Sequence, residues 1–190
     1  MNIGLYFGSF NPIHHGHLII ANHIVQTMPL DEVWFIVSPQ NPFKPAATLL
    51  NENHRYFLVQ EAIEGEHRLK ASNVEFHLPK PSYTIHTLTY LQEQYPKHRF
   101  HVIMGSDSFQ NITRWKNGEL ILKNYPIIIY KRPGFVVEPV EGAHITIADA
   151  PLLEISSTHI RELIKRNQSI RYLVPDAVIR EIEKGMYYKK

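Results

Sequence analysis

Three histidines lie within four consecutive positions near the N-terminus, in the stretch GLYFGSFNPIHHGHL that covers residues 4–18. A strand-like run and a glycine turn precede them, and a helical pattern begins near Gly16, so they stand at a helix N-terminus. Free N–H groups and the helix dipole favour a phosphate there, and Gly16 would let it approach closely. His14 and His17 share one side, where each imidazole can donate a hydrogen bond. His15 should point elsewhere.

A metal centre is the rival interpretation of this cluster, because histidine is the commonest metal ligand. The cluster contains no Asp or Glu, and its H-x-G-H spacing differs from the i, i+4 pair of H-E-x-x-H on a helix. We therefore expect a phosphate site without metal ligands from the protein. The plainest alternative, histidines in a solvated loop, would suit a single histidine better than this pattern.

The whole chain has 190 residues, enough for one substantial core, so residues 1–190 are expected to form a single domain. Its formal charge of +2 provides no global field that would demand nucleic acid or a membrane. The absence of cysteine excludes disulfides and thiolate chemistry, and no apolar run is long enough to span a bilayer. We expect a soluble cytoplasmic protein, and a homo-oligomer remains possible.

Short runs rich in β-branched and aromatic residues alternate with helical patterns along the chain. The expected strands are residues 2–7, 32–38, 99–104 and 126–130. The expected helices include one starting near residue 16, one capped by Asn51, one capped by Ser82, and two at 156–166 and 176–184, the last stopped at Gly185. This order predicts an α/β fold, a Rossmann-like doubly wound parallel sheet with C-terminal closing helices. Such sheets bind ligands at the carboxyl ends of their strands.

Six stretches in series carry a family resemblance. They are GSFNPIHHGHL, SPQNPFKP, PSYTIHTL, GSDSFQNITRW, YKRPG and ISSTHIREL, and the match runs from Gly8 to Arg161. Together they resemble bacterial nicotinate (nicotinamide) mononucleotide adenylyltransferases of the H-x-G-H nucleotidyltransferase superfamily. The resemblance implies adenylyl transfer from ATP to nicotinate mononucleotide, which gives nicotinate adenine dinucleotide and pyrophosphate in NAD biosynthesis. It also implies Mg²⁺, which we expect the ATP phosphates to carry.

The resemblance also assigns roles to individual residues. The implied catalytic residues are His14, His17 and Arg161. The implied ATP-binding residues are Gly8, Ser9, Phe10, Gly16, Gly105, Asp107, Ser156, Ser157 and Thr158. The implied mononucleotide-binding residues are Lys44, Tyr83, Thr84, Trp115 and Arg132. No residue is assigned to a metal.

Several of these residues also have ordinary structural explanations. Residues 156–158 with Arg161 could be a capped helix start instead of a second phosphate clamp. Asp107 could cap a helix or accept a hydrogen bond from a ribose hydroxyl, and Trp115 could belong to the core instead of stacking on a pyridine ring. Lys44 lies in the proline-rich segment 38–50, expected as an ordered loop, where it could be solvated or contact a phosphate.

The helix expected after Ser82 bears on substrate choice. If Ser82 is its cap, the backbone N–H groups of Tyr83 and Thr84 lie where a carboxylate is favoured. The sequence therefore predicts a preference for nicotinate over nicotinamide mononucleotide.

Two positions depart from the family pattern. Asn11 stands where many relatives have aspartate, and His86 stands where they have aspartate after S-Y-T-x, so neither receives a carried-over role. The alternatives are another transferase of the superfamily, such as phosphopantetheine adenylyltransferase or a cytidylyltransferase, and a nucleotide-binding sensor without catalysis. Class I aminoacyl-tRNA synthetases share the H-x-G-H motif, but this chain lacks their lysine-rich second signature.

Overall fold

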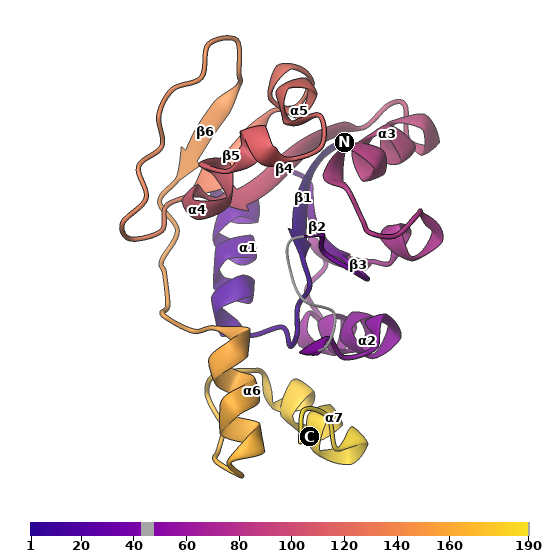
Figure 1. The fold of residues 1–190 in the computed structure, drawn as a ribbon, viewed down its shortest axis with the longest axis vertical. Coiled ribbons are helices and arrows are strands. Elements are labelled where there is room, and N and C mark those ends of the chain that lie inside the picture. The colour runs from indigo at the N-terminus through magenta and orange to yellow at the C-terminus, as the bar shows by residue number, and fades with distance from the viewer. Residues whose placement is uncertain (43–47, 190) are drawn as a thin grey trace.

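The computed structural model describes residues 1–42 and 48–189. Within these residues one six-stranded parallel sheet has the order β3-β2-β1-β4-β5-β6 (Figure 1). Its strands are β1 (Asn2–Gly8), β2 (Glu32–Val37), β3 (Leu69–Ser72), β4 (Arg99–Gly105), β5 (Ile127–Tyr130) and β6 (Ile145–Ala148). The strand order reverses between β1 and β4, which is where sheets of this type bind ligands.

Helices cover both faces of the sheet. They are α1 (His15–Thr27), α2 (Glu52–Ala62), α3 (Thr84–Gln94), α4 (Ser106–Phe109), α5 (Gly118–Asn124), α6 (Ser157–Lys165) and α7 (Asp176–Gly185), with 3₁₀ helices η2 (Val74–His77) and η3 (Ile112–Arg114). Apolar side chains of α1, α2, α6 and α7 pack in one core cluster, and those of α3, α4 and α5 in the other. The expected doubly wound α/β fold is confirmed.

The buried strands supply both clusters because their side chains alternate between the two faces of the sheet. Ile127 and Ile129 of β5 belong to the α3 side, whereas Ile128 and Tyr130 belong to the α1 side. All four are buried. This pattern explains why an uninterrupted apolar run in the sequence predicts a strand covered on both faces.

The structure differs from the sequence-based expectation at the sheet edges. The edge strands β3 and β6 were not expected, because each has only four residues, some of them partly exposed, and no long apolar run. A helix near Asp107 was expected only as one alternative for that residue, and the short helix α5 was not expected. Among the described residues, no helix is both long enough and apolar enough to cross a membrane.

Two expected helix ends are wrong. Tyr83, with extended backbone, occupies the N-cap of α3, whereas Ser82 is buried just before it. Gly185 is the last residue of α7, and the left-handed residue that ends the helix is Met186, with φ 50°. Gly185 does not have a left-handed backbone, and a Cβ atom there would overlap the ring of Tyr187 unless that ring moved.

Candidate active site

The loop between β1 and α1 places two histidine rings together at the start of α1. His14 is the N-cap residue, and its backbone N–H donates to Nδ1 of His17 over 3.3 Å. The two rings stack with centroids 3.7 Å apart. Because Nδ1 of His17 accepts this hydrogen bond, the proton of a neutral imidazole belongs on Nε2. His17 therefore has a donor at the opposite side of its ring.

A cavity of about 440 Å³ opens beside these histidines. Its lining includes His14, Gly16, His17, Asp107, Arg132 and Ser156. His15 is not part of that lining, and its backbone N–H donates to the carbonyl of Leu173 over 2.9 Å. The cavity thus collects residues from the loops after β1, β4 and β5 and from the start of α6.

His14 is only 5% exposed, and its environment disfavours the imidazolium form. Burial lowers the pKa of His14 to about 4, with further lowering by the positive charges of Arg132 and His15. At neutral pH this imidazole is uncharged and has one N–H group that can donate a hydrogen bond. A hydrogen-bonded phosphate would favour the charged form and raise that pKa.

Gly16 has a second role beside access to the helix start. A Cβ atom there would come within 2.9 Å of Cε1 of His14, closer than such atoms approach. Glycine at this position therefore leaves room for the His14 ring to lie across the start of α1.

Phe10 lies in the core instead of the cavity. It is 2% exposed, and its ring packs edge-on against His17 with centroids 5.1 Å apart. The rings of Tyr6 and Phe35 pack edge-on against Phe10 in the same aromatic cluster. Phe10 is placed to hold the ring of His17.

Of the other residues implied to bind ATP, Gly8 and Gly105 are the last residues of β1 and β4, and Ser9 is buried in the loop after β1.

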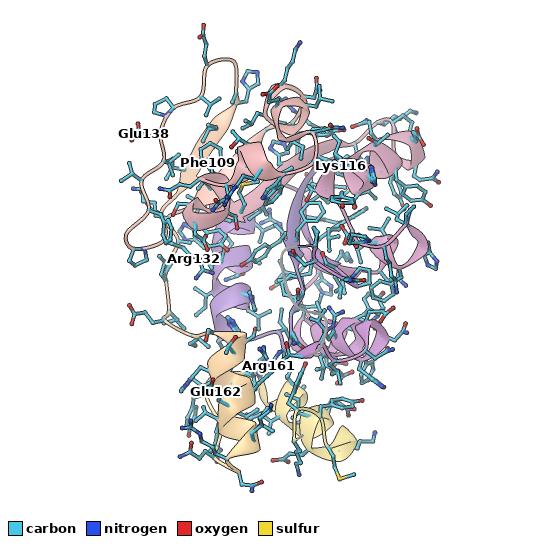
Figure 2. All side chains as sticks on the ribbon, in the orientation of Figure 1. Phe109, Lys116, Arg132, Glu138, Arg161 and Glu162 are labelled. Carbon is cyan, nitrogen blue, oxygen red and sulfur yellow. The ribbon has the colours of Figure 1, made fainter. Side chains whose placement is uncertain are left out.

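The start of α6 joins the histidine loop from the far end of the sequence. Ser156 is its N-cap and accepts from the backbone N–H of His159 over 3.1 Å. Ser157 Oγ donates to the carbonyl of Pro12 over 2.9 Å, and Arg161 Nη1 donates to that of Asn11 over 2.9 Å. Figure 2 shows Arg161 on the side of α6 that faces the rest of the molecule. The predicted second clamp therefore lies beside the first.

The members of this helix start do not all face the histidine cavity. Ser156 lines it, whereas Thr158 and Arg161 line a neighbouring cavity of about 580 Å³ together with Leu50 and Tyr188. Thr158 Oγ1 also accepts from Arg161 Nη2 over 3.3 Å. In this structure Arg161 supports the loop that carries the histidines.

Asp107 and Arg132 form an ion pair at the histidine cavity. Arg132 Nε lies 3.4 Å from Asp107 Oδ1, and both side chains are partly exposed. The backbone N–H of Arg132 donates to Ser106 Oγ over 2.7 Å, which fixes the segment after β5 against α4. Although the sequence assigned Arg132 to the mononucleotide, the structure places it with His14 and His17.

A second cavity of about 180 Å³ opens beside α3. Its lining includes three residues implied to bind the mononucleotide, Tyr83, Thr84 and Trp115, together with Gly8, Ser38, Glu75, Ser82, Ser108 and Lys116. Lys116 Nζ lies 4.7 Å from the centroid of the Tyr83 ring. Lys44, the other residue implied there, lies outside the described residues. An indole face, a helix start and one cation are thus available to a ring that bears a carboxylate.

Sequence reasoning missed the buried acid of this second cavity. Glu75 is 1% exposed, and its Oε1 accepts from Thr87 Oγ1 over 2.7 Å. Burial raises the pKa of Glu75, against a lowering by the hydroxyls of Thr87, Ser38 and Ser82. Oε2 has no partner with hydrogen-bond geometry among the described residues. The segment before PSYT showed no helical pattern, so no sequence signal marked Glu75 as buried.

Asn11 holds the histidine loop against the segment before α2. Its Nδ2 donates to the carbonyl of Thr48 over 2.8 Å, and its Oδ1 accepts from the backbone N–H of Leu50 over 3.1 Å. The side chain is therefore used as both donor and acceptor. An aspartate could accept from Leu50 but could not donate to Thr48, so asparagine suits this loop contact better.

No group of three or more histidine, aspartate or glutamate side chains in the described part of the chain is arranged to hold a metal ion. Two carboxylates line the histidine cavity, those of Asp107 and Glu154, and Asp107 pairs with Arg132. A divalent ion that arrives with a nucleotide needs only its phosphate oxygens and water.

The fold and both cavities define a nucleotide-binding α/β protein, and comparison with known proteins gives its family. The model of the cytidylyltransferase-like family matches residues 5–163, and the chain belongs to that family. A probable nicotinate-nucleotide adenylyltransferase from Cytophaga hutchinsonii is 50% identical over 189 residues, 99% of this chain and 98% of that protein. One from Flavobacterium johnsoniae is 47% identical over the full length of both. The family resemblance expected from the motifs is confirmed.

Solved structures show the same fold. The nicotinic acid mononucleotide adenylyltransferase of Plasmodium falciparum, complexed with NaAD, aligns with a TM-score of 0.83 over 98% of this chain and 97% of that one. Its sequence is 23% identical, so this likeness supports the architecture and not the roles of residues.

Proposed function

We propose that the chain is a nicotinate-nucleotide adenylyltransferase, which transfers the adenylyl group of ATP to nicotinate mononucleotide. The products are nicotinate adenine dinucleotide and pyrophosphate. The observation that carries this proposal is the 50% identity to the Cytophaga hutchinsonii relative over nearly all of both chains. The two cavities at the carboxyl ends of the strands support it, because the reaction brings together a phosphate-rich donor and a ring-bearing acceptor.

The chemical step is a displacement at the α-phosphorus of ATP. A phosphate oxygen of the mononucleotide forms a bond to that phosphorus while the bond to the β-phosphate breaks, and pyrophosphate leaves with the electron pair. No covalent intermediate with the protein is needed, so positioning and charge neutralisation are the main tasks. MgATP is the substrate form, with the ion on the phosphate oxygens.

His14 and His17 are proposed to bind the ATP phosphates in the histidine cavity. Each neutral imidazole can donate a hydrogen bond through its N–H group, and donors fixed before the reaction cost no reorganisation as negative charge develops. Ser156 and the backbone at the start of α1 would add to this site. Asp107 is proposed to accept from a ribose hydroxyl, and Arg132 to contribute positive charge.

The mononucleotide is proposed to occupy the cavity beside α3, with its pyridine ring against Trp115. The backbone N–H groups at the start of α3, at Tyr83 and Thr84, would donate to the nicotinate carboxylate. A carboxylate offers two charged acceptor oxygens, whereas a carboxamide must turn an NH₂ toward one of the donors. Hydrogen bonds to charged groups contribute roughly 1.5–3 kcal/mol, so the acid should be preferred by about ten- to a hundredfold in kcat/KM.

Pyrophosphate release by the purified protein with MgATP and a panel of acceptors tests the proposal. We expect turnover with nicotinate mononucleotide and weaker turnover with nicotinamide mononucleotide. No turnover is expected with 4′-phosphopantetheine or with the acceptors that cytidylyltransferases use. Chromatography of the dinucleotide identifies the product. Turnover only with phosphopantetheine would assign the chain to another transferase of the family, and activity that persists in excess EDTA would contradict the role of Mg²⁺.

A further inference from the structure

Arg55 of α2 is a buried cation whose hydrogen bonds all go to backbone carbonyls. Its exposed fraction is 0%, and it is the largest fully buried side chain in the described part of the molecule. Its Nε donates to Leu50 O over 2.7 Å, its Nη1 to Ser9 O over 2.5 Å and to Ser38 O over 2.8 Å, and its Nη2 to Pro39 O over 3.1 Å.

These four carbonyls belong to three separate segments. Ser9 lies in the loop that leads to His14, Ser38 and Pro39 follow β2, and Leu50 directly precedes the N-cap of α2. Ser38 also lines the cavity beside Trp115. One nitrogen, Nη1, therefore bonds both the histidine loop and a wall of the second cavity.

Stability alone does not explain a buried arginine at this position. Burial lowers the pKa of Arg55, with partial compensation from Tyr188 and Glu52, and Arg55 forms no ion pair with another described residue. The guanidinium nevertheless stays charged, because the pKa of arginine starts far above neutral. A buried charge without a carboxylate is costly, and an apolar residue on the face of α2 that bears Leu58 would avoid that cost.

We propose that Arg55 is a positioning residue that sets the spacing between the histidine loop and the Trp115 cavity. Its planar group reaches four carbonyls from three segments at once, whereas an ammonium group has only three donors on one atom and an apolar side chain has none. The proposal rests on the proposed function, in which the substrates held at these two places must meet in line. An error of about 1 Å in such an arrangement can reduce the rate about a hundredfold.

The test compares Arg55→Lys with Leu58→Ala. Leu58 is fully buried on the same helix and belongs to the core cluster beside α1, away from both cavity linings. Arg55→Lys should lower kcat roughly ten- to a hundredfold while the KM of each substrate changes less than about threefold. Leu58→Ala should lower the melting temperature yet keep the kcat of each folded molecule. If Arg55→Lys instead behaves like Leu58→Ala, losing stability but keeping kcat, the proposal is overturned.

Hydrogen exchange provides a readout that does not depend on activity. In Arg55→Lys, or in Arg55→Gln if the lysine variant does not fold, faster exchange is expected at residues 9–14, 38–42 and 48–51 and not in β4 or α3. A wild-type protein that makes no dinucleotide would defeat the proposed function, while this local pattern would still support the positioning role. If exchange becomes faster throughout the molecule in the Arg55 variant, as it would in Leu58→Ala, Arg55 serves only stability.

Discussion

The two cavities at the carboxyl ends of the strands are built from different parts of the chain and hold different chemistry. The histidine cavity presents imidazoles beside an arginine, and its lining comes from residues 14, 16, 17, 20, 107, 132, 133, 135 and 152–156. Most of the Trp115 cavity comes from residues 38–116, and it presents an indole, hydroxyls and a buried acid. The first is suited to stabilising charge that changes during a reaction, and the second to holding a ring.

Each cavity contains one buried titratable group, and burial acts on both in the same sense. It lowers the pKa of His14 and raises the pKa of Glu75, so the neutral form is favoured in each. The comparison teaches that the two cavities obtain their fixed positive charge from Arg132, Lys116 and helix starts, and not from their buried titratable groups. The predictions below separate the two cavities by rate, by stability and by binding.

The largest expected effect is on catalysis in the histidine cavity. His17→Ala should lower kcat about a hundredfold or more, because its imidazole donates to charge that grows in the transition state. The KM of the mononucleotide should stay nearly unchanged, since the ring cavity is intact. His15→Ala, outside the cavity lining, is the matched control and should be milder. Steady-state kinetics with both variants measure this, and equal losses would remove the distinction between the two histidines.

The second effect is on stability in acid. Because the folded pKa of His14 is about 4 and the ordinary value is 6.5, the unfolded chain binds a proton in that interval that the folded chain does not. The contribution of His14 to the free energy of unfolding is therefore fully present above pH 6.5 and is lost as the pH falls toward 4. Between pH 7 and pH 5 the loss should be about 2 kcal/mol.

Urea unfolding at these two pH values, in the wild type and in His14→Asn, isolates the contribution of His14. Asparagine is a favourable N-cap residue and does not titrate, so helix α1 should still begin at the same place. The wild type should lose about 2 kcal/mol more than the variant. The same pH dependence in both proteins would show that His14 is not the group responsible.

The third effect is on binding in the ring cavity. Trp115→Ala should raise the KM of nicotinate and nicotinamide mononucleotide together by about tenfold, because stacking of a base on an aromatic ring contributes roughly 1–3 kcal/mol and does not depend on the carboxylate. The change in kcat should be smaller. Kinetics with both mononucleotides at saturating MgATP test this, and a loss confined to the acid would mean that Trp115 contributes to selectivity.

The smallest expected effect concerns Glu75. Since its folded pKa is raised, the folded chain keeps a proton that the unfolded chain loses, and stability falls as the pH rises through the folded pKa. Glu75→Gln keeps the shape and cannot ionise, so it should be more stable than the wild type at pH 8 by about 1 kcal/mol, the size of one hydrogen bond. This advantage should disappear at pH 4. A variant less stable than the wild type at both pH values would contradict the raised pKa of Glu75.

The sequence predicted the features that depend on local pattern. The run from residue 2 to residue 7 and the following glycine turn placed His14 and His17 correctly at a helix start, because apolar strands and helix N-termini have strong local signals. The edge strands β3 and β6 lack such signals, since few of their residues are buried. Their position follows from pairing with β2 and β5, which is a tertiary property.

Other residues depended on contacts between distant segments. Arg132 follows β5, and its place beside His14 is determined by the order of the strands in the sheet and not by neighbouring residues. Arg55 did carry a signal, because a charged residue stands three positions before Leu58 on the face of α2 that packs into the core. Glu75 carried none.

The bonds from α6 to the histidine loop also bear on how the protein is made. Ser157 and Arg161 lie 145 and 150 residues beyond the carbonyls of Pro12 and Asn11 that they contact. Contacts between residues so far apart in sequence form late, because the loop between them must close first. When the ribosome has synthesised the chain only through β6, the segment with the histidines already exists, but the helix α6 that supports its loop does not. The start of α1 should therefore acquire its final shape only after α6 has emerged from the ribosome.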